Sequence, residues 1–103
     1  MRTFKCDFGK GITCSIKVTA TPPAKGLSHV RAVEWTGQRT PKTTALYMAW
    51  MHSVNKQLSD EWNIGLIHVF RTAANRAEIW LYTPGKAPKQ IERSILADTN
   101  APL

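Results

Sequence analysis

The sequence has no long hydrophobic run. None of its apolar segments approaches the roughly 20 residues that a membrane-spanning helix needs. Its first residues, Met1–Lys5, include two cations and lack the continuous apolar segment of a secretory signal. We therefore expect a soluble, cytoplasmic protein that has no contact with a membrane.

The sequence also lacks the motifs of common catalytic and cofactor sites. It has no G-x-S-x-G, no glycine-rich nucleotide pattern and no H-x-x-x-H. Cys6 and Cys14 lack the C-x-x-C spacing, and His29, His52 and His68 are far apart in the chain. We therefore predict a non-enzymatic protein that needs no metal or other cofactor.

Acidic residues are few. The chain has 7 Asp and Glu against 14 Lys and Arg, which gives a net charge of +7. Such a balance allows binding to nucleic acid or another polyanion. However, the cations are spread almost evenly along the chain, without a basic run or a basic helical stripe. Solubility explains this distribution as well as a phosphate-binding surface does.

Two strands are expected near the N-terminus, because apolar and polar side chains alternate at residues 3–8 and 12–19. A three-residue turn between them would set Phe8 against Ile12 and Cys6 against Cys14. A cross-strand disulfide is then conceivable, but two buried thiols are the interpretation we prefer. After a proline-containing loop, a third strand is expected at 29–35, with Val30 and Ala32 facing away from Val33 and Trp35.

One long amphipathic helix is expected next. Thr40 is a suitable N-cap and Pro41 suits the first helical position, so the helix should begin there and run to about Trp62. At helical spacing one face is apolar, and it comprises Leu46, Tyr47, Trp50, Met51, Val54, Leu58 and Trp62. The opposite face carries His52, Ser53, Lys56, Ser59 and Asp60.

The segment from Ile64 to Tyr82 reads as a hairpin with large apolar residues on both faces. With Ala74 and Asn75 as the turn, Arg71 would face Glu78 and Val69 would face Trp80. One face would then hold Leu66, His68, Phe70, Ile79 and Leu81. The other would hold Ile67, Val69, Trp80, Tyr82 and the Arg71–Glu78 pair. A slip of one residue would exchange these sets.

The predicted fold class is α+β. We expect a two-layer sandwich in a single domain, with a largely antiparallel sheet of about five strands in the order β-β-β-α-β-β and the long helix on one face. Residues Pro88–Leu96 are a possible short C-terminal helix, with Ile91, Ile95 and Leu96 facing inward. Residues 98–103 are expected to be frayed.

The leading functional hypothesis is binding through the hairpin face that the helix leaves uncovered. The candidate residues are Ile67, Val69, Arg71, Trp80, Tyr82 and Arg76. Such a face is typical of protein interfaces, which favours a homo-oligomer, with a dimer as the simplest form, or docking of a protein partner. If instead the C-terminal segment folds back over this face, nothing is exposed.

Two alternatives remain open at this stage. Trp80 and Tyr82 could stack the bases of a single-stranded nucleic acid while Arg71 and Arg76 bind phosphates. A small-molecule ligand could instead occupy a cleft between helix and sheet, lined by Trp35, Trp50 and Trp62.

Overall fold

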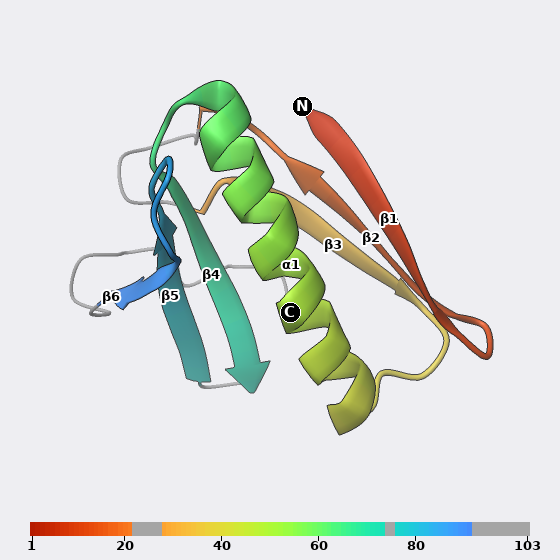
Figure 1. Cartoon of the computed structure of the whole chain (residues 1–103). Helices are drawn as coiled ribbons and strands as arrows, with labels where there is room; N and C mark the ends of the chain where they lie inside the picture. Colours follow the sequence, from red (N-terminus) through yellow and green to blue (C-terminus); the bar gives the residue numbers. More distant parts are fainter. Residues whose placement is uncertain (22–27, 74–75, 92–103) are drawn as a thin grey trace.

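The protein has an α+β fold, as predicted, in which one long helix packs on sheets that comprise six strands (Figure 1). The computed structural model describes residues 1–21, 28–73 and 76–91. The strands form two antiparallel three-stranded sheets rather than one sheet of about five, in the orders β1-β2-β3 and β4-β5-β6. The elements are β1 (Arg2–Gly9), β2 (Ile12–Val18), β3 (Val30–Thr36), α1 (Pro41–Trp62), β4 (Leu66–Ala73), β5 (Arg76–Tyr82) and β6 (Lys89–Ile91).

The first sheet follows the alternation in the sequence. Phe4 lies opposite Ile16 and Cys6 opposite Cys14, as predicted. At the turn, however, Gly9 takes the place expected of Phe8 opposite Ile12, because the register shifts between Asp7 and Gly9. Exposed Lys5 and Lys17 occupy the outer face, while Cys14, Ile16 and Val18 are buried under the helix.

A second irregularity in this sheet changes the predicted faces of β3. The register shifts at Lys17 and Val18, so that Val18 pairs with Val30 while Lys17 pairs with Ala32. The extra residue turns Val30 into the core, where it is fully buried, on the same side as Val33 and Trp35. The prediction that Val30 shares a face with Ala32 was therefore wrong.

Helix α1 begins and ends where the sequence indicates. Thr40 is the N-cap: its hydroxyl accepts the Thr43 N–H at 3.2 Å, and its own N–H donates to the Thr43 hydroxyl at 2.8 Å. Asn63 ends the helix in the left-handed conformation. The burial differs in part from the predicted stripe, because Leu46 is 45 % exposed whereas Asn55 and Ser59 are fully buried.

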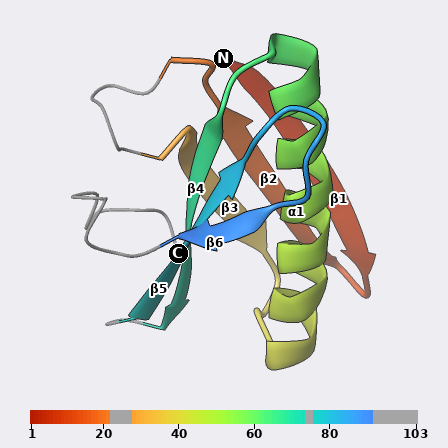
Figure 2. The same ribbon diagram turned by 60° about the vertical axis from the view of Figure 1, so that its left-hand side comes forward.

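The two sheets meet at one point and diverge from it. The His29 N–H donates to the Ile67 carbonyl at 2.8 Å, and the Ile67 N–H donates to His29 Nδ1 at 3.0 Å. From this junction β3 and β4 separate, and α1 lies across the opening between them (Figures 1 and 2). One main core therefore joins both sheets to the helix, and it includes Ile16, Val30, Met51, Leu58, Leu66, Phe70 and Tyr82.

The predicted register of the β4–β5 hairpin was wrong by one residue. Phe70 pairs with Glu78, Val69 with Ile79 and His68 with Trp80, and the register shifts between Arg71 and Ala73. This bulge adds a residue to β4, and a shift of one residue turns every later side chain of a strand to the other face. Arg71 therefore pairs with Ala77 instead of Glu78.

The chain after β5 forms a strand where a helix was considered possible. Residues Lys89–Ile91 form β6 and pair with β5, with Ile91 opposite Ile79. Ile95 and Leu96, and the predicted frayed end at 98–103, lie outside the described residues. Within the described part of the chain, no helix has the length and apolar character needed to span a membrane.

Candidate functional site

Of the six residues predicted to form a binding face, the four large apolar and aromatic ones are divided between two faces of the second sheet. Trp80 and Tyr82 face the helix, together with Leu66, His68 and Phe70. Ile67 and Val69 face the other way and pack with Ile79. Arg76 is exposed at the start of β5. The predicted grouping of Trp80 and Tyr82 with Ile67 and Val69 was therefore wrong, because the bulge in β4 turns the β5 residues to the opposite face while Ile67 and Val69 stay on the face away from the helix.

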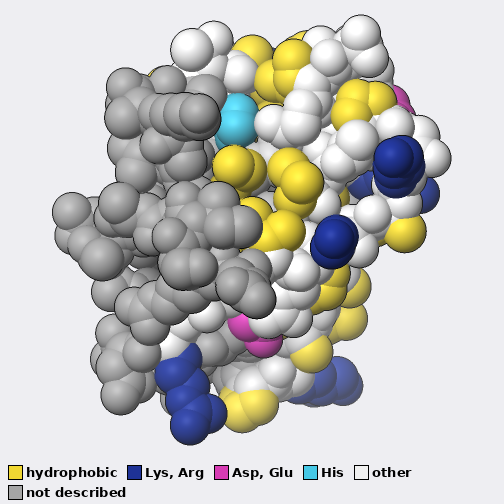
Figure 3. All heavy atoms as spheres, turned by 90° about the vertical axis from the view of Figure 1, so that its left-hand side faces the viewer, with side chains coloured by type: hydrophobic (Ala, Val, Ile, Leu, Met, Phe, Trp, Pro, Cys, Tyr) yellow, Lys and Arg dark blue, Asp and Glu magenta, His cyan; other side chains and the backbone are white. Residues whose placement is uncertain are grey.

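Both faces of this sheet are nevertheless apolar, as the sequence indicates. The face away from the helix carries a second, smaller cluster in which Val69 and Ile79 are 2 % and 4 % exposed. Ile67, Ala77 and Ile91 pack against these two side chains. Figure 3, in which the left-hand side of Figure 1 faces the viewer, shows hydrophobic atoms on the described surface of the molecule.

On the helix side, Trp80 and Tyr82 surround a histidine that the sequence analysis placed on the polar face of α1. The Tyr82 hydroxyl lies 2.7 Å from His52 Nδ1, and the Trp80 ring centroid is 4.5 Å from that of His52. Trp80 Nε1 donates to Glu78 at 3.1 Å. Burial lowers the pKa of His52, and nearby Glu78 acts in the opposite direction. The hydrogen bond between His52 and the Tyr82 hydroxyl thus holds the end of β5 on the helix.

Aromatic rings form a continuous contact network from this point into the first sheet. Phe70 lies 5.0 Å from His52 and 6.1 Å from Tyr47 between ring centroids. Tyr47 in turn lies 5.4 Å from Trp35, which stacks on Phe8 at 5.6 Å. Because these rings fill the space between the sheets and α1, the network is part of the packing of the main core.

A buried polar pair lies beside the ring network. The Asn55 amide donates to the Met51 carbonyl at 2.8 Å and to His68 Nδ1 at 3.1 Å. Burial lowers the pKa of His68 to about 3, with a further contribution from His52, so its imidazole is neutral. Asn55 Oδ1 is buried without a hydrogen-bond partner in the described structure. The hydrogen bond between Asn55 and His68 thus links α1 to the second sheet.

Sequence reasoning missed the role of the polar residues on α1. His52, Asn55 and Ser59 are spaced three and four residues apart, which places them on one side of a helix. That spacing was the available signal, and it marks the side of α1 that faces the second sheet. The apolar residues Tyr47, Met51, Val54 and Leu58 alone did not reveal that the helix contacts two sheets.

The two cysteines are free thiols. Cys14 is buried and Cys6 is half-buried, and they lie opposite each other on β1 and β2. Burial raises the pKa of both thiols, to about 11 for Cys14. Protonated thiols are poor nucleophiles and poor metal ligands. Within the described residues, no group of three His, Cys, Asp or Glu side chains is placed to hold a metal ion.

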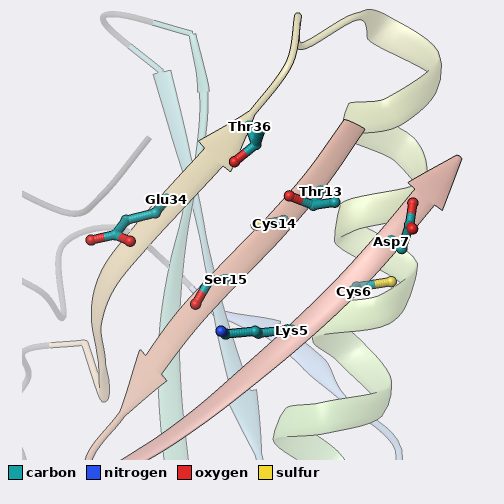
Figure 4. Close-up of a pocket in the computed structure, with 8 residues that line it drawn as sticks. All are labelled: Lys5, Cys6, Asp7, Thr13, Cys14, Ser15, Glu34 and Thr36. Carbon is teal, nitrogen blue, oxygen red and sulfur yellow. The ribbon is translucent and has the colours of Figure 1, made fainter. Parts of the chain in front are cut away.

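Two hollows lie on the described surface, and neither of them is lined by tryptophan. One, of about 460 Å³, lies over the outer face of the first sheet, where Lys5, Asp7, Thr13 and Glu34 line it (Figure 4). The other, of about 390 Å³, lies between the β1–β2 turn and the start of α1, and Leu46 lines it. Trp35, Trp50 and Trp62 instead pack against the main core. Ligand binding in a tryptophan-lined cleft stays an untested prediction.

The long outer strand β1 is the other notable feature. It is the outermost strand of its sheet, with β2 on one side, and its pairing with β2 is regular from Arg2 to Asp7 (Figures 1 and 2). By contrast, the described part of β6, at the edge of the second sheet, comprises three residues, Lys89–Ile91. Comparison of the chain with family models, curated proteins and solved structures finds no match.

Proposed function

We propose that this protein is a non-enzymatic interaction module that works by self-association through the edge of its first sheet. The observation that carries the proposal is the eight-residue strand β1, whose outer side has no neighbouring strand among the described residues. Unpaired backbone N–H and C=O groups along such an edge are a template for another strand.

The polar groups that resemble catalytic machinery support the non-enzymatic part of the proposal. His29 bonds to the Ile67 backbone, His52 to Tyr82 and His68 to Asn55. Burial lowers the pKa of all three imidazoles. Each histidine therefore makes a hydrogen bond within the fold, and protonation or deprotonation during acid–base catalysis would break that bond.

Nucleic-acid binding is a weaker candidate in the form that the sequence suggested. Tyr82 is fully buried, so its ring is not available to stack on a base. Trp80 is half-buried against His52. The remaining support is the net charge of +7 and the exposed Arg76.

The proposal is tested by measuring mass and backbone protection as a function of concentration. Sedimentation velocity should show a monomer at low concentration and a dimer at higher concentration. Hydrogen exchange on the same samples should show that β1 amides gain protection with concentration, while β6 amides do not. A strictly monomeric protein with unchanged β1 exchange would overturn the proposal. Oligonucleotide binding that weakens steeply with salt would favour the alternative.

A further inference from the structure

We infer that two copies pair through β1 in one antiparallel register, in which Cys6 lies opposite Cys6 of the second copy. This inference rests on the proposed self-association and specifies its geometry. In this register Lys5 faces Asp7 of the second copy, and Phe4 faces its Phe8. The result is a continuous six-stranded sheet with both helices on the same side.

The alternation of β1 restricts the possible registers. Lys5 and Asp7 are exposed on the outer face, while Phe4, Cys6 and Phe8 are half-buried on the helix side. Opposite residues of an antiparallel pair share a face, so a two-fold axis perpendicular to the sheet must pair outer residues with outer residues. Residues on the helix side then also pair with one another.

Charge selects one of the registers that remain. A shift that sets Lys5 opposite itself brings two cations together, and a shift that sets Asp7 opposite itself brings two carboxylates together. The intermediate register, centred on Cys6, pairs each Lys5 with an Asp7 and does so twice because of the symmetry. Opposite charges on facing strands stabilise a sheet, and like charges destabilise it.

The same charges argue for a second copy as the partner rather than an unrelated strand. A lysine in the middle of an edge strand normally discourages pairing, because it brings an unpaired charge to the contact. Lys5 has no hydrogen-bond or ion-pair partner within the described part of the chain. Asp7 uses Oδ1 to accept the Gly9 N–H at 2.8 Å, which leaves its second oxygen for Lys5 of the other copy.

Cys6 lies at the centre of this arrangement and reports on it. Figure 4 shows its side chain projecting from β1 on the side away from β2. In the inferred register the two Cys6 Cβ atoms would be about 4.5–5.5 Å apart, close to the range that a disulfide bridges. Cys14 is 1 % exposed on the neighbouring strand and cannot meet its copy there.

The first test is oxidation of the thiols with diamide. Two thiols lose two electrons and two protons to the diazene, which becomes a hydrazine, and an S–S bond forms. The Cys14→Ser variant should form a covalent dimer at concentrations where the protein is dimeric, and the Cys6→Ser variant should not. A Lys5→Cys variant without the two native thiols should cross-link more slowly, since its thiols would not be opposite each other.

The second test is a charge exchange measured as the dimer dissociation constant. Lys5→Glu replaces both favourable pairs with repulsive ones and should weaken the dimer by about tenfold or more. Adding Asp7→Lys should restore most of the affinity. Lys17→Glu makes the same charge change at an exposed position of β2 and should have little effect. Circular dichroism confirms folding, and Lys5→Gln replaces Lys5→Glu if the latter unfolds.

The outcomes separate the two proposals. The protein could dimerise although its Cys6 thiols fail to cross-link and Lys5→Glu has the same dimer affinity as Lys17→Glu. That result would overturn this register but not the proposed self-association. A protein that stays monomeric at every concentration would overturn both. Cross-linking at Cys6 that persists unchanged in Lys5→Glu would indicate random collision and would also overturn the register.

Discussion

The two sheets pack on the same helix and have the same number of strands, yet the pattern of their faces differs. The first sheet has a polar outer face and an apolar inner face, so a one-residue slip between β1 and β2 would place polar side chains in the core. The second sheet has an apolar cluster on each face. Either register of β4 and β5 then satisfies the hydrophobic pattern, and the bulge near the turn decides between them. The hydrophobic pattern thus excludes a one-residue slip only where the two faces of a sheet differ.

The largest expected effect concerns the ring network where the helix meets the second sheet. Phe70 is 1 % exposed and its ring lies against those of Tyr47, His52 and His68. Phe70→Ala should lower the free energy of unfolding by about 3–5 kcal/mol, because it leaves a cavity shared by both layers. Urea unfolding followed by circular dichroism measures this loss.

Phe8→Ala in the first sheet is the matched control. Phe8 also contacts two aromatic rings, Trp35 and Trp50, but it is half-buried at the end of β1. We expect less than half the loss seen for Phe70→Ala, since the space can fill with solvent. Equal losses would mean that the core between the sheets is no more tightly packed than the edge of the first sheet.

Much of the fold can be predicted from the sequence, and the errors have local causes. The boundaries of α1 follow from Thr40, Pro41 and the apolar spacing, and the pairing of Cys6 with Cys14 follows from alternation. The faces of β4 were predicted correctly, but the exchange of faces in β5 could not be predicted, because no residue type marks a bulge inside a strand without glycine. The separation into two sheets depends on how α1 packs against the strands. The spacing of His52, Asn55 and Ser59 suggests a second contact face on the helix but does not indicate two sheets.

The candidate site was harder to predict than the fold. Trp80 and Tyr82 were assigned a binding role because they were expected on the sheet face away from the helix, where large apolar side chains would need a binding partner to bury them. In the structure they meet His52, whose place on the polar side of the helical pattern concealed this contact. The edge of β1 depends on which strands lie next to each other, and strand order is a property of the whole fold.

The second prediction concerns the pH dependence of the second sheet's contact with the helix. His68 has a pKa of about 3 in the folded protein against 6.5 for the free side chain, so the unfolded state binds the proton first as the pH falls. Its contribution to stability is therefore complete above about pH 6.5 and is lost as the pH drops toward 3. In this window the free energy of unfolding should fall by about 1.4 kcal/mol per pH unit from this group alone.

His68→Gln tests this origin directly, because glutamine does not titrate and its carbonyl can accept the Asn55 amide proton. Urea unfolding at several pH values below about 6 gives the slope of the unfolding free energy against pH, which counts the protons taken up on unfolding. In His68→Gln this number should be smaller by nearly one than in the unmodified protein. His52→Gln is the control: His52 is only half-buried, so its removal should reduce the slope less. An unchanged slope in His68→Gln would show that other groups cause the acid sensitivity.

The smallest expected effect compares two glycines, one from each half of the molecule. Gly37 and Gly85 have φ values of +86° and +71°, which side chains with a Cβ rarely adopt, so alanine should cost about 1–2 kcal/mol at either position. At Gly37 the added Cβ would also lie 2.8 Å from the Gly11 carbonyl oxygen in the β1–β2 turn, whereas nothing lies within 4 Å at Gly85. Gly37→Ala should therefore be destabilised by roughly 1 kcal/mol more than Gly85→Ala in urea unfolding. The positive φ costs about the same at both positions, so the difference between the two losses of unfolding free energy measures how tightly the end of β3 packs on the β1–β2 turn. Equal losses would show that the turn moves to accommodate the added Cβ.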